Sequence, residues 1–409
     1  MAIKRIQVSN FKSFKELNLE LGMFNVLIGA NASGKSNFTQ IFKFFTNMLT
    51  QGLDNAISLE GGAEYLRNIN IGSSKDFSFR IVFDIQAQSP IGNFVVRVFE
   101  EIYEFAIKFT GESDYEISED KLILKCHFFR PPTHGENIET IGEGDIILRV
   151  VKRKINVDLS SLPDEISVSL TESDIVPQFW IERELPSERF LLQIPVFILP
   201  PLQMIFGSIP IYDFDPQLSK DVAKIAGKAE LEEDGRNLSL VLKNIKKNDE
   251  RAKALGYHIR DIFPYIDNID VKVENKSLLF KVHEIYFKED LPAFLISDGT
   301  INLIAIIIAL FFEETKLVAI FEEPERNIHP YLIYELTNLM KDASQNKQII
   351  ITTHNPEILK HVNLKDLLLV SRDDEGYSTI SRPSEKQEVV KAVKEMGIDE
   401  LYVQKLLEL

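Results

Sequence analysis

The chain has 409 residues, of which 44% are hydrophobic and 26% are charged. This composition is typical of soluble globular proteins and excludes disordered, collagen-like and disulfide-rich chains. Its 46 lysines and arginines against 62 aspartates and glutamates give a net charge of −16, which disfavours general binding to nucleic-acid phosphates because such binding needs clustered positive charge. The single cysteine, Cys126, excludes an internal disulfide and a cysteine metal cage and indicates a reducing compartment.

Two apolar stretches approach the roughly 20 residues that a membrane-spanning helix needs. The stretch 294–312 carries Ser, Asp, Gly and Asn near its start, and the stretch 190–211 contains two glutamines and four prolines. Both therefore predict buried core. The N-terminal sequence MAIKRIQVSNFKSF has no apolar segment after its basic residues, as a secretory signal would. We expect a cytoplasmic protein that makes no contact with a membrane.

The first fifty residues predict three strands followed by a helix. Alternating or continuous apolar residues mark strands at 4–8, 17–21 and 24–28. Over 36–49 the apolar residues recur at steps of three and four, which is typical of a helix with one buried face. A glycine-containing turn joins the third strand to this helix. The segment therefore predicts a strand, loop and helix unit.

The next part of the chain predicts antiparallel β-structure. β-Branched and aromatic residues alternate over 77–85 and 93–129, with Gly and Asp at the expected turns, and the pattern continues over 145–170. We therefore expect an N-terminal lobe at 1–90 and a β-rich insertion at 91–215.

Beyond Pro216 the pattern becomes helical, with helices predicted at 218–231 and 237–255 inside a helical segment at 216–262. A C-terminal lobe at 263–409 predicts alternating elements. They are strands at 269–273, 278–282, 317–321 and 348–353 and helices at 300–312 and 330–343. This alternation predicts an α/β sheet covered by helices. No long heptad run marks an extended coiled coil.

The strongest motif is GANASGKS at residues 29–36, which fits G-x-x-x-x-G-K-[ST]. In such a loop backbone N–H groups surround phosphates, Lys35 reaches the β and γ oxygens and Ser36 binds Mg²⁺. The alternative is a plain glycine turn with a surface lysine. The loop follows an apolar strand and opens a helix, whose N-terminus attracts anions, and this context favours the phosphate loop.

Two adjacent acids follow the predicted strand 317–321. Glu322 and Glu323 would lie at the carboxyl end of the strand, where ligand crevices of α/β sheets form. Hydrolysis needs a carboxylate near Mg²⁺ and a group that orients water, so we expect Glu322 to hold Mg²⁺ through water and Glu323 to polarise the nucleophile. A solvated acidic turn is the alternative.

His354 follows the predicted strand 348–353, and the turn at Asn355-Pro356 would leave its imidazole facing the same crevice. A sensor of the γ-phosphate fits this position, whereas an isolated histidine at a strand end is more often structural. The segment Ser297-Asp298-Gly299-Thr300 precedes the predicted helix 300–312. Taken alone it predicts an N-cap rather than a binding site.

These pieces, in this order, resemble the ABC-type ATPase heads of the SMC and RecF-like superfamily. Within it, the strings at 212–216, 234–238, 297–300 and 322–330 are similar to the compact bacterial "predicted AAA family ATPases" (AAA_21-like). The resemblance covers residues 1 to about 85 and about 210 to 370. It implies an α/β P-loop NTPase fold, an ABC-type head with an antiparallel β subdomain and the β-rich insertion.

The resemblance also implies ATP and Mg²⁺ as cofactors, with Glu323, His354 and Lys35 catalytic and with Ser36 and Glu322 as metal ligands. Nucleotide contacts would come from Lys12, Asn31, Ala32, Ser33, Gly34, Lys35, Ser36 and Asn37. Ser297 and Gly299 would complete the nucleotide site of a second subunit, so that ATP joins two heads. Asn327 and His329 would lie at that dimer seam.

Three positions depart from the wider pattern. The signature is Ser297 to Thr300 instead of Ser-Gly-Gly-Gln, the first acid after the strand is Glu322 instead of Asp, and Ala32 stands where Gly is frequent. Ala32 leaves the phosphate loop intact if its φ is negative.

The leading hypothesis is an ATP-hydrolysing homodimer, or higher homo-oligomer, that acts as a switch in anti-phage defence or DNA repair. Only about 55 residues follow His354, too few for a Toprim nuclease domain, and no zinc-type clustering of His and Cys occurs. We therefore expect any nuclease to be a separate effector protein, with the acidic surface and the insertion available for docking it.

Three alternatives remain at this point. One is a scaffold that ATP locks with little turnover, which the intact Glu323 disfavours, and another is a transporter motor, which the long insertion disfavours. The third is a clamp that binds DNA through basic residues at 243–253, although a solvated helix face explains them equally well. Apolar residues over 386–409 predict a terminal helix that packs on its own lobe rather than on a partner.

Overall fold

The computed structural model describes residues 2–111, 114–131, 139–186, 189–199, 207, 209–274 and 276–408. The chain forms two compact units. Unit 1 comprises Met1–Gly22, Ser36–Ile209 and Ser371–Ile380, and unit 2 comprises Met23–Lys35, Pro210–Val370 and Ser381–Leu409. Each unit is built from several stretches of chain, and the chain passes from unit 2 to unit 1 between Lys35 and Ser36.

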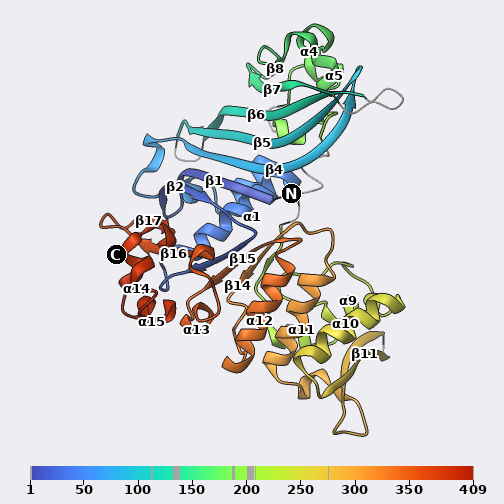
Figure 1. The fold of residues 1–409 in the computed structure, drawn as a ribbon. Helices are drawn as coiled ribbons and strands as arrows, with labels where there is room; N and C mark the ends of the chain where they lie inside the picture. The colour runs from blue at the N-terminus through green and yellow to red at the C-terminus, as the bar shows by residue number, and fades with distance from the viewer. Residues whose placement is uncertain are drawn as a thin grey trace. The chain divides into compact units, whose positions relative to one another are not determined.

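Unit 1 contains a seven-stranded antiparallel sheet in the order β2-β1-β4-β5-β6-β7-β8 (Figure 1). Its strands are β1 (Ala2–Phe11), β2 (Phe14–Glu20), β4 (Phe77–Ile91), β5 (Phe94–Phe109), β6 (Tyr115–Arg130), β7 (Glu139–Val151) and β8 (Lys154–Asp158). Period-two alternation buries the aromatic face, where Phe11, Phe44, Phe77 and Phe79 form successive ring contacts. The boundary expected at residue 90 lies inside β4, so the β-rich segment continues the N-terminal sheet.

The helices of unit 1 are mostly short. They are α1 (Lys35–Gln51), α2 (Leu53–Leu59), α3 (Ala63–Leu66), α4 (Asp164–Ser169), α5 (Glu172–Ile175) and α6 (Gln178–Glu182), with 3-10 turns η1 (Gly72–Ser74) and η2 (Leu191–Gln193). Three of them, α4 to α6, lie where the sequence analysis expected more β-structure. With 17 residues, α1 is the longest described helix, so the described part of the chain has no extended coiled coil.

Unit 2 is organised around parallel strands in the order β16-β3-β15-β14-β9. They are β3 (Phe24–Ile28), β9 (Ile211–Tyr212), β14 (Val318–Glu322), β15 (Gln348–Thr353) and β16 (Leu367–Arg372), and β17 (Ser378–Ser381) follows β16 in the chain. The central three are buried almost throughout, as strands covered on both faces must be. The predicted strands 24–28, 317–321 and 348–353 are therefore confirmed.

Helices cover this sheet and share its core (Figure 1). The main ones are α9 (Leu238–Ile245), α10 (Asp249–Ile262), α11 (Asp298–Phe311) and α12 (Pro330–Ala343). A smaller sheet is formed by β10 (Ala223–Lys224), β11 (Ile266–Glu274), β12 (Ser277–Glu284) and β13 (Leu291–Pro292), followed by η3 (Ala293–Leu295). Twelve of the fourteen residues of α11 are buried, which explains its uniform hydrophobicity, and no described helix is long and apolar enough to cross a membrane.

The prediction of a helix at 218–231 is wrong. Only α8 (Pro216–Lys220) forms there, and β10 and irregular chain follow. The second predicted helix, 237–255, is divided at Asn248, whose side chain accepts a hydrogen bond from the Arg251 amide at 3.1 Å and caps α10. Local hydrogen bonding of an Asn side chain thus overrides the helical periodicity.

The C-terminal segment packs on unit 2. It contains α13 (Pro356–Leu359), η4 (Leu364–Asp366), η5 (Pro383–Glu385), α14 (Gln387–Ala392), α15 (Ile398–Val403) and η6 (Leu406–Glu408). Val389 and Leu401 are fully buried in the core of this unit. The expected packing of this terminal segment on its own lobe is confirmed for its described residues, 386–408.

Candidate functional site

The loop after β3 has the close backbone packing that a phosphate-binding turn requires. A Cβ on Gly29 would lie 2.4 Å from the Val370 carbonyl oxygen and 2.6 Å from Ser33 Oγ, so no larger residue fits there. The Lys35 ammonium donates to the carbonyl oxygens of Gly29 at 2.7 Å and Ala30 at 3.0 Å. Burial lowers the pKa of Lys35, against the opposing influence of Glu323 and Glu325. The lysine is therefore held against the loop by these two hydrogen bonds.

The backbone at Ala32 does not have the negative φ that an intact phosphate loop was expected to need. Its φ is +63°, in the left-handed region that costs an L-residue roughly 1–2 kcal/mol. Ala32 is exposed and the Ser33 amide donates to Ala30 O at 3.2 Å, which closes the turn. The loop keeps its glycine-like shape here with some backbone strain.

Three other predicted contact residues belong to unit 1. Ser36 is exposed on the first turn of α1, and Asn37 donates to Ser13 Oγ at 2.6 Å. Lys12 lies 2.7 Å from a Glu60 carboxylate oxygen in a largely buried ion pair. Their contact with nucleotide stays a prediction.

The two predicted acids lie where β14 ends. Glu322 is paired with Thr352 of β15 in the parallel register. Glu323 leaves the strand with φ +45°, and its amide donates to Thr352 O at 2.8 Å. This left-handed residue turns the chain at the sheet edge, so consecutive carboxylates leave β14 at its carboxyl end, as the strand pattern predicted.

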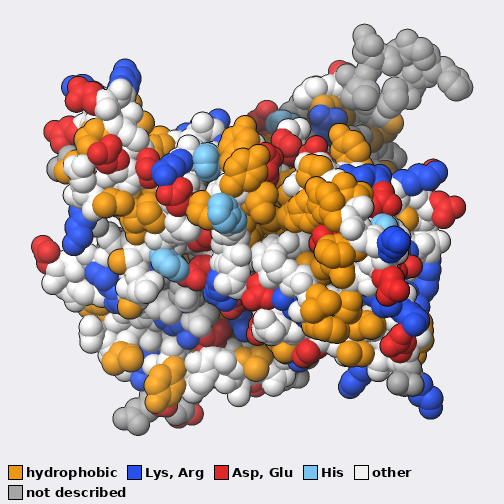
Figure 2. Space-filling model, turned by 90° about the horizontal axis from the view of Figure 1, so that it is seen from below, with side chains coloured by type: hydrophobic (Ala, Val, Ile, Leu, Met, Phe, Trp, Pro, Cys, Tyr) orange, Lys and Arg blue, Asp and Glu red, His pale blue; other side chains and the backbone are white. Residues whose placement is uncertain are grey.

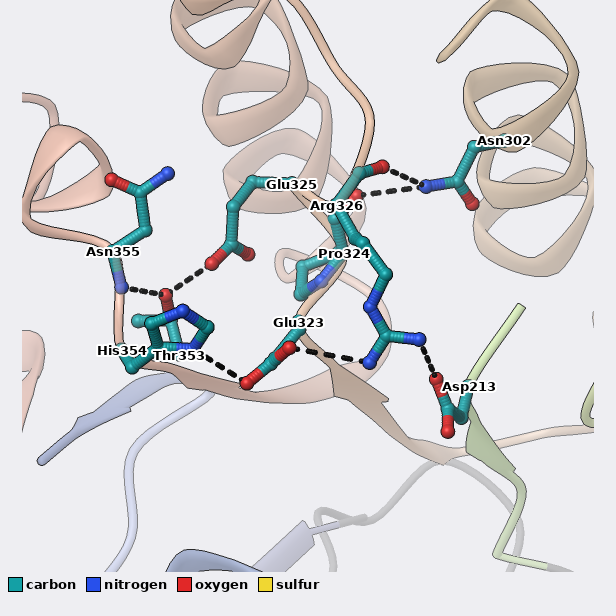
Figure 3. A network of polar contacts seen from close by, with 9 residues as sticks. All are labelled: Asp213, Asn302, Glu323, Pro324, Glu325, Arg326, Thr353, His354 and Asn355. Atoms are coloured by element: carbon teal, nitrogen blue, oxygen red, sulfur yellow. Dashed lines mark hydrogen bonds and ion pairs between the residues drawn. The ribbon is translucent and has the colours of Figure 1, made fainter. Parts of the chain in front are cut away.

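Glu323 and His354 are brought together, as Figure 3 shows. His354 Nδ1 lies 2.6 Å from Glu323 Oε1, and Arg326 Nη2 lies 3.2 Å from Oε2. Burial would raise the pKa of Glu323, but the hydrogen bonds from His354 and Arg326 outweigh it and hold the pKa below its usual range. The carboxylate is therefore ionised at neutral pH and able to accept a hydrogen bond from water.

Four neighbours of this pair were missed by the sequence analysis as site residues. Glu325 is 5% exposed and accepts a hydrogen bond from Thr353 Oγ1, and burial raises its pKa. The others are Arg326, Asp213 and Asn302, which connect the loop after β14 to β9 and α11. Asp213 had a usable signal, because it follows an apolar strand in the same way as Glu322.

The signature segment forms the start of α11. Ser297 caps this helix by accepting a hydrogen bond from the Thr300 amide at 3.1 Å, and Asp298 pairs with Lys220. A Cβ on Gly299 would lie 2.5 Å from the Asn327 carbonyl oxygen. The N-cap prediction is confirmed, and Gly299 is needed for close approach to the loop after β14.

The arrangement fits a nucleotide with Mg²⁺. The tight loop at Gly29 and the ammonium of Lys35 supply hydrogen-bond donors for phosphate. The acids after β14 supply a carboxylate for the ion. Among the described residues, no group of three or more His, Cys, Asp or Glu side chains could hold a metal by itself.

A phosphate loop after one strand of a parallel sheet, with acids and a histidine at the ends of the next two strands, defines a P-loop nucleotide-binding protein. Residues 24–360 match the family described as "AAA domain, putative AbiEii toxin, Type IV TA system" (AAA_21). Because this match covers most of the chain, the protein belongs to that family of P-loop ATPases.

Solved structures with a similar fold are heads of SMC proteins. An SMC head bound to the C-winged helix domain of ScpA is 13% identical, with 93% of this chain and 97% of that chain covered and a TM-score of 0.49. The SMC head domain from Thermotoga maritima is 14% identical, with 93% and 99% covered and a TM-score of 0.42. An SMC head with an extended coiled coil, bound to the C-terminal domain of ScpA derived from Pyrococcus furiosus, is 13% identical, with 96% and 99% covered and a TM-score of 0.45. No curated protein matches the chain.

Proposed function

We propose that this protein is an ATP-hydrolysing switch whose subunits join through ATP. One observation carries the proposal: Glu323 and His354 meet at the ends of β14 and β15, in the same unit as the Lys35 loop that follows β3. Family membership supports nucleotide binding. The ionised Glu323 suits the orientation of an attacking water, which a pure scaffold would not need.

Each residue then has a distinct chemical task. Lys35 leaves the carbonyls of Gly29 and Ala30 for the β- and γ-phosphate oxygens, and the loop amides with Asn31 to Gly34 surround the phosphates. Ser36 and Glu322 would hold Mg²⁺, which neutralises charge on the phosphates when it is bound. Glu323 accepts a hydrogen bond from the attacking water, and His354 orients Glu323 and senses the γ-phosphate.

The proposed dimer uses Ser297 and Gly299 of one subunit to complete the site of the other. An exposed apolar run precedes them, and hydrophobic side chains also gather in patches on the face shown in Figure 2. The run consists of Ile285, Tyr286, Phe287, Phe294 and Leu295. Large exposed apolar side chains occur at interaction sites, and we propose that these residues contact a second copy or an effector.

The regulated process is proposed to be anti-phage defence or DNA repair, acting on a separate effector such as a nuclease or on DNA. Direct DNA binding by residues 243–253 has little support. Lys246 donates to Asn268 and Ile269, Lys247 donates to Asn244, and Arg251 donates to the Phe312 carbonyl. Three of the five cations in this segment therefore make hydrogen bonds within unit 2 and are less available for phosphates, which favours an effector protein.

The test is ATP turnover and mass in solution, with and without ATP and Mg²⁺, for the wild type, Glu323→Gln and Lys35→Met. We expect turnover in the wild type, an ATP-stabilised dimer or larger assembly with slow turnover in Glu323→Gln, and neither in Lys35→Met. Lys35→Met serves as the control for nucleotide binding. An ATP-dependent mass change without any wild-type turnover would instead support a nucleotide-locked scaffold.

A further inference from the structure

The loop after β14 is folded so that Arg326 returns to Glu323. The Arg326 amide donates to Glu323 O at 2.9 Å and the Ile328 amide donates to Glu325 O at 3.0 Å. Glu323 and Asn327 both have positive φ values, +45° and +63°. Left-handed non-glycine residues persist only where the surrounding structure fixes them, and they gather at functional sites.

The Arg326 guanidinium joins two carboxylates from different strands. Nη2 lies 3.2 Å from Glu323 Oε2, and Nη1 lies 2.9 Å from Asp213 Oδ1. Asp213 follows β9, which pairs with β14, and its own amide donates to Glu233 O at 3.0 Å. The planar fork of Arg suits such a two-sided contact, which the single ammonium of Lys makes less well.

The backbone of the same loop is anchored by α11. The Asn302 side-chain amide donates to Pro324 O at 3.2 Å and to Arg326 O at 3.0 Å, and Asn302 is 3% exposed. One helix turn earlier, Gly299 lets the Asn327 carbonyl approach α11. The backbone of Arg326 is therefore fixed by α11 and its side chain by Asp213 (Figure 3).

We propose that Arg326 is a positioning residue for hydrolysis, and that Asp213 acts on Glu323 through it. This inference rests on the proposed function. His354 holds Oε1 and Arg326 holds Oε2, so two donors on opposite sides fix the rotation of the carboxylate and leave its remaining lone pairs for water. Without Arg326 the carboxylate rotates about its contact with His354, and fewer molecules present it in the productive direction.

The test is a mutant cycle in steady-state ATP hydrolysis with Arg326→Ala, Arg326→Lys, Asp213→Asn and the double variant Asp213→Asn/Arg326→Ala. We expect Arg326→Ala to lower kcat about tenfold with little change in KM, because positioning affects the reacting geometry more than ground-state binding. Asp213→Asn should lower kcat about threefold, and the double variant should equal Arg326→Ala. Arg326→Lys should recover part of the loss.

Several outcomes would overturn the inference while wild-type turnover keeps the proposed function intact. A normal kcat in Arg326→Ala would show that the arginine does not position Glu323, and a higher KM at constant kcat would make it a nucleotide contact. Additive losses in the double variant would show that Asp213 acts independently. Thermal unfolding of each variant separates these results from misfolding. If Arg326→Ala is unstable, the kcat values of Asp213→Asn and Arg326→Lys test the inference instead. Absence of wild-type turnover would overturn both proposals.

Discussion

The pKa values of two glutamates, one in each unit, are shifted in opposite directions. Glu101, on β5 of unit 1, is completely buried, and its oxygens have no hydrogen-bond partner among the described residues. Glu323, at the edge of the unit 2 sheet, has a side chain that is 26% exposed and receives donors on both oxygens. Burial raises the pKa of Glu101 to about 8, whereas the donors hold the pKa of Glu323 below its usual range.

The difference shows that burial and hydrogen-bond donors shift the pKa of a carboxylate in opposite directions, and that the balance differs from site to site. Asp120, also in unit 1, accepts hydrogen bonds from Tyr103 Oη at 2.9 Å and the Leu191 amide at 2.9 Å. Burial still raises its pKa, to about 7, against these two donors. Burial therefore favours the neutral form of Glu101 and Asp120 in unit 1, whereas the donors around Glu323 in unit 2 favour an anion that can act on water.

The largest expected effect comes from neutralising each glutamate in turn. Glu323→Gln should lower kcat for ATP about 10²–10⁴-fold, the usual contribution of a group that acts on the nucleophile. Glu101→Gln should leave turnover within about twofold, because nothing places it in the site. Parallel turnover assays with both variants check this, and an equal loss in the two would remove the functional contrast.

A smaller but still large effect is expected from Gly299→Ala. The added methyl would meet the Asn327 carbonyl oxygen at 2.5 Å, so α11 or the loop after β14 must move, at a cost of about 1–3 kcal/mol. We expect a lower melting temperature together with slower turnover, since the loop carries Glu323. Gly227→Ala is a suitable control, because its φ is not positive and the added methyl would make only an ordinary contact, 3.5 Å from Leu240 Cδ2. Unchanged stability and turnover in Gly299→Ala would contradict the coupling of α11 to this loop.

The pH dependence of stability should separate the two carboxylates. Burial raises the folded-state pKa of Glu101 from its ordinary value of 4.5 to about 8, so the folded state binds more protons between these values. The contribution of Glu101 to the free energy of unfolding is then fully present at low pH and is lost as pH rises toward about 8. Glu101→Gln should flatten this loss, with a melting temperature at pH 8.5 higher than that of the wild type by about 2–4 °C for each kcal/mol recovered. Asp120 leaves a residual slope of the same sign, and identical pH profiles would mean that Glu101 is ionised or solvated.

Sequence patterns predicted the parts of the site that are local in the chain. The phosphate loop, the acids after β14 and His354 each follow an apolar run at a strand end. This rule predicted that the acids and His354 share one crevice, and Glu323 and His354 lie 2.6 Å apart, while their roles stay predictions. Asn302 and Arg326 were missed because their roles depend on which elements become neighbours in three dimensions. Asp213 also follows an apolar run at a strand end, but β9 has only two residues, so the signal is weaker than at Glu322.

In the fold, too, local features were predicted and features that depend on distant partners were missed. The parallel strands of unit 2 were predicted because each is a buried run bounded by turn residues. The continuity of the unit 1 sheet was missed because β1 pairs with β4, a strand about 70 residues later, and local alternation does not reveal partners. The sequence likewise could not show that Ala32 takes a positive φ, since that angle is imposed by the turn around it.

The smallest predicted effect concerns this strained position. Ala32→Gly should stabilise the protein by up to about 1 kcal/mol, because release of the left-handed strain is partly offset by the greater freedom of glycine in the unfolded chain. The matched control is Ala30→Gly in the same loop, where φ is not positive and glycine should therefore destabilise. Thermal unfolding of both variants measures the sign, and turnover should survive in Ala32→Gly. If both variants lose stability equally, the backbone at Ala32 carries no strain, and the alanine is as well suited to this phosphate loop as the glycine that it replaces.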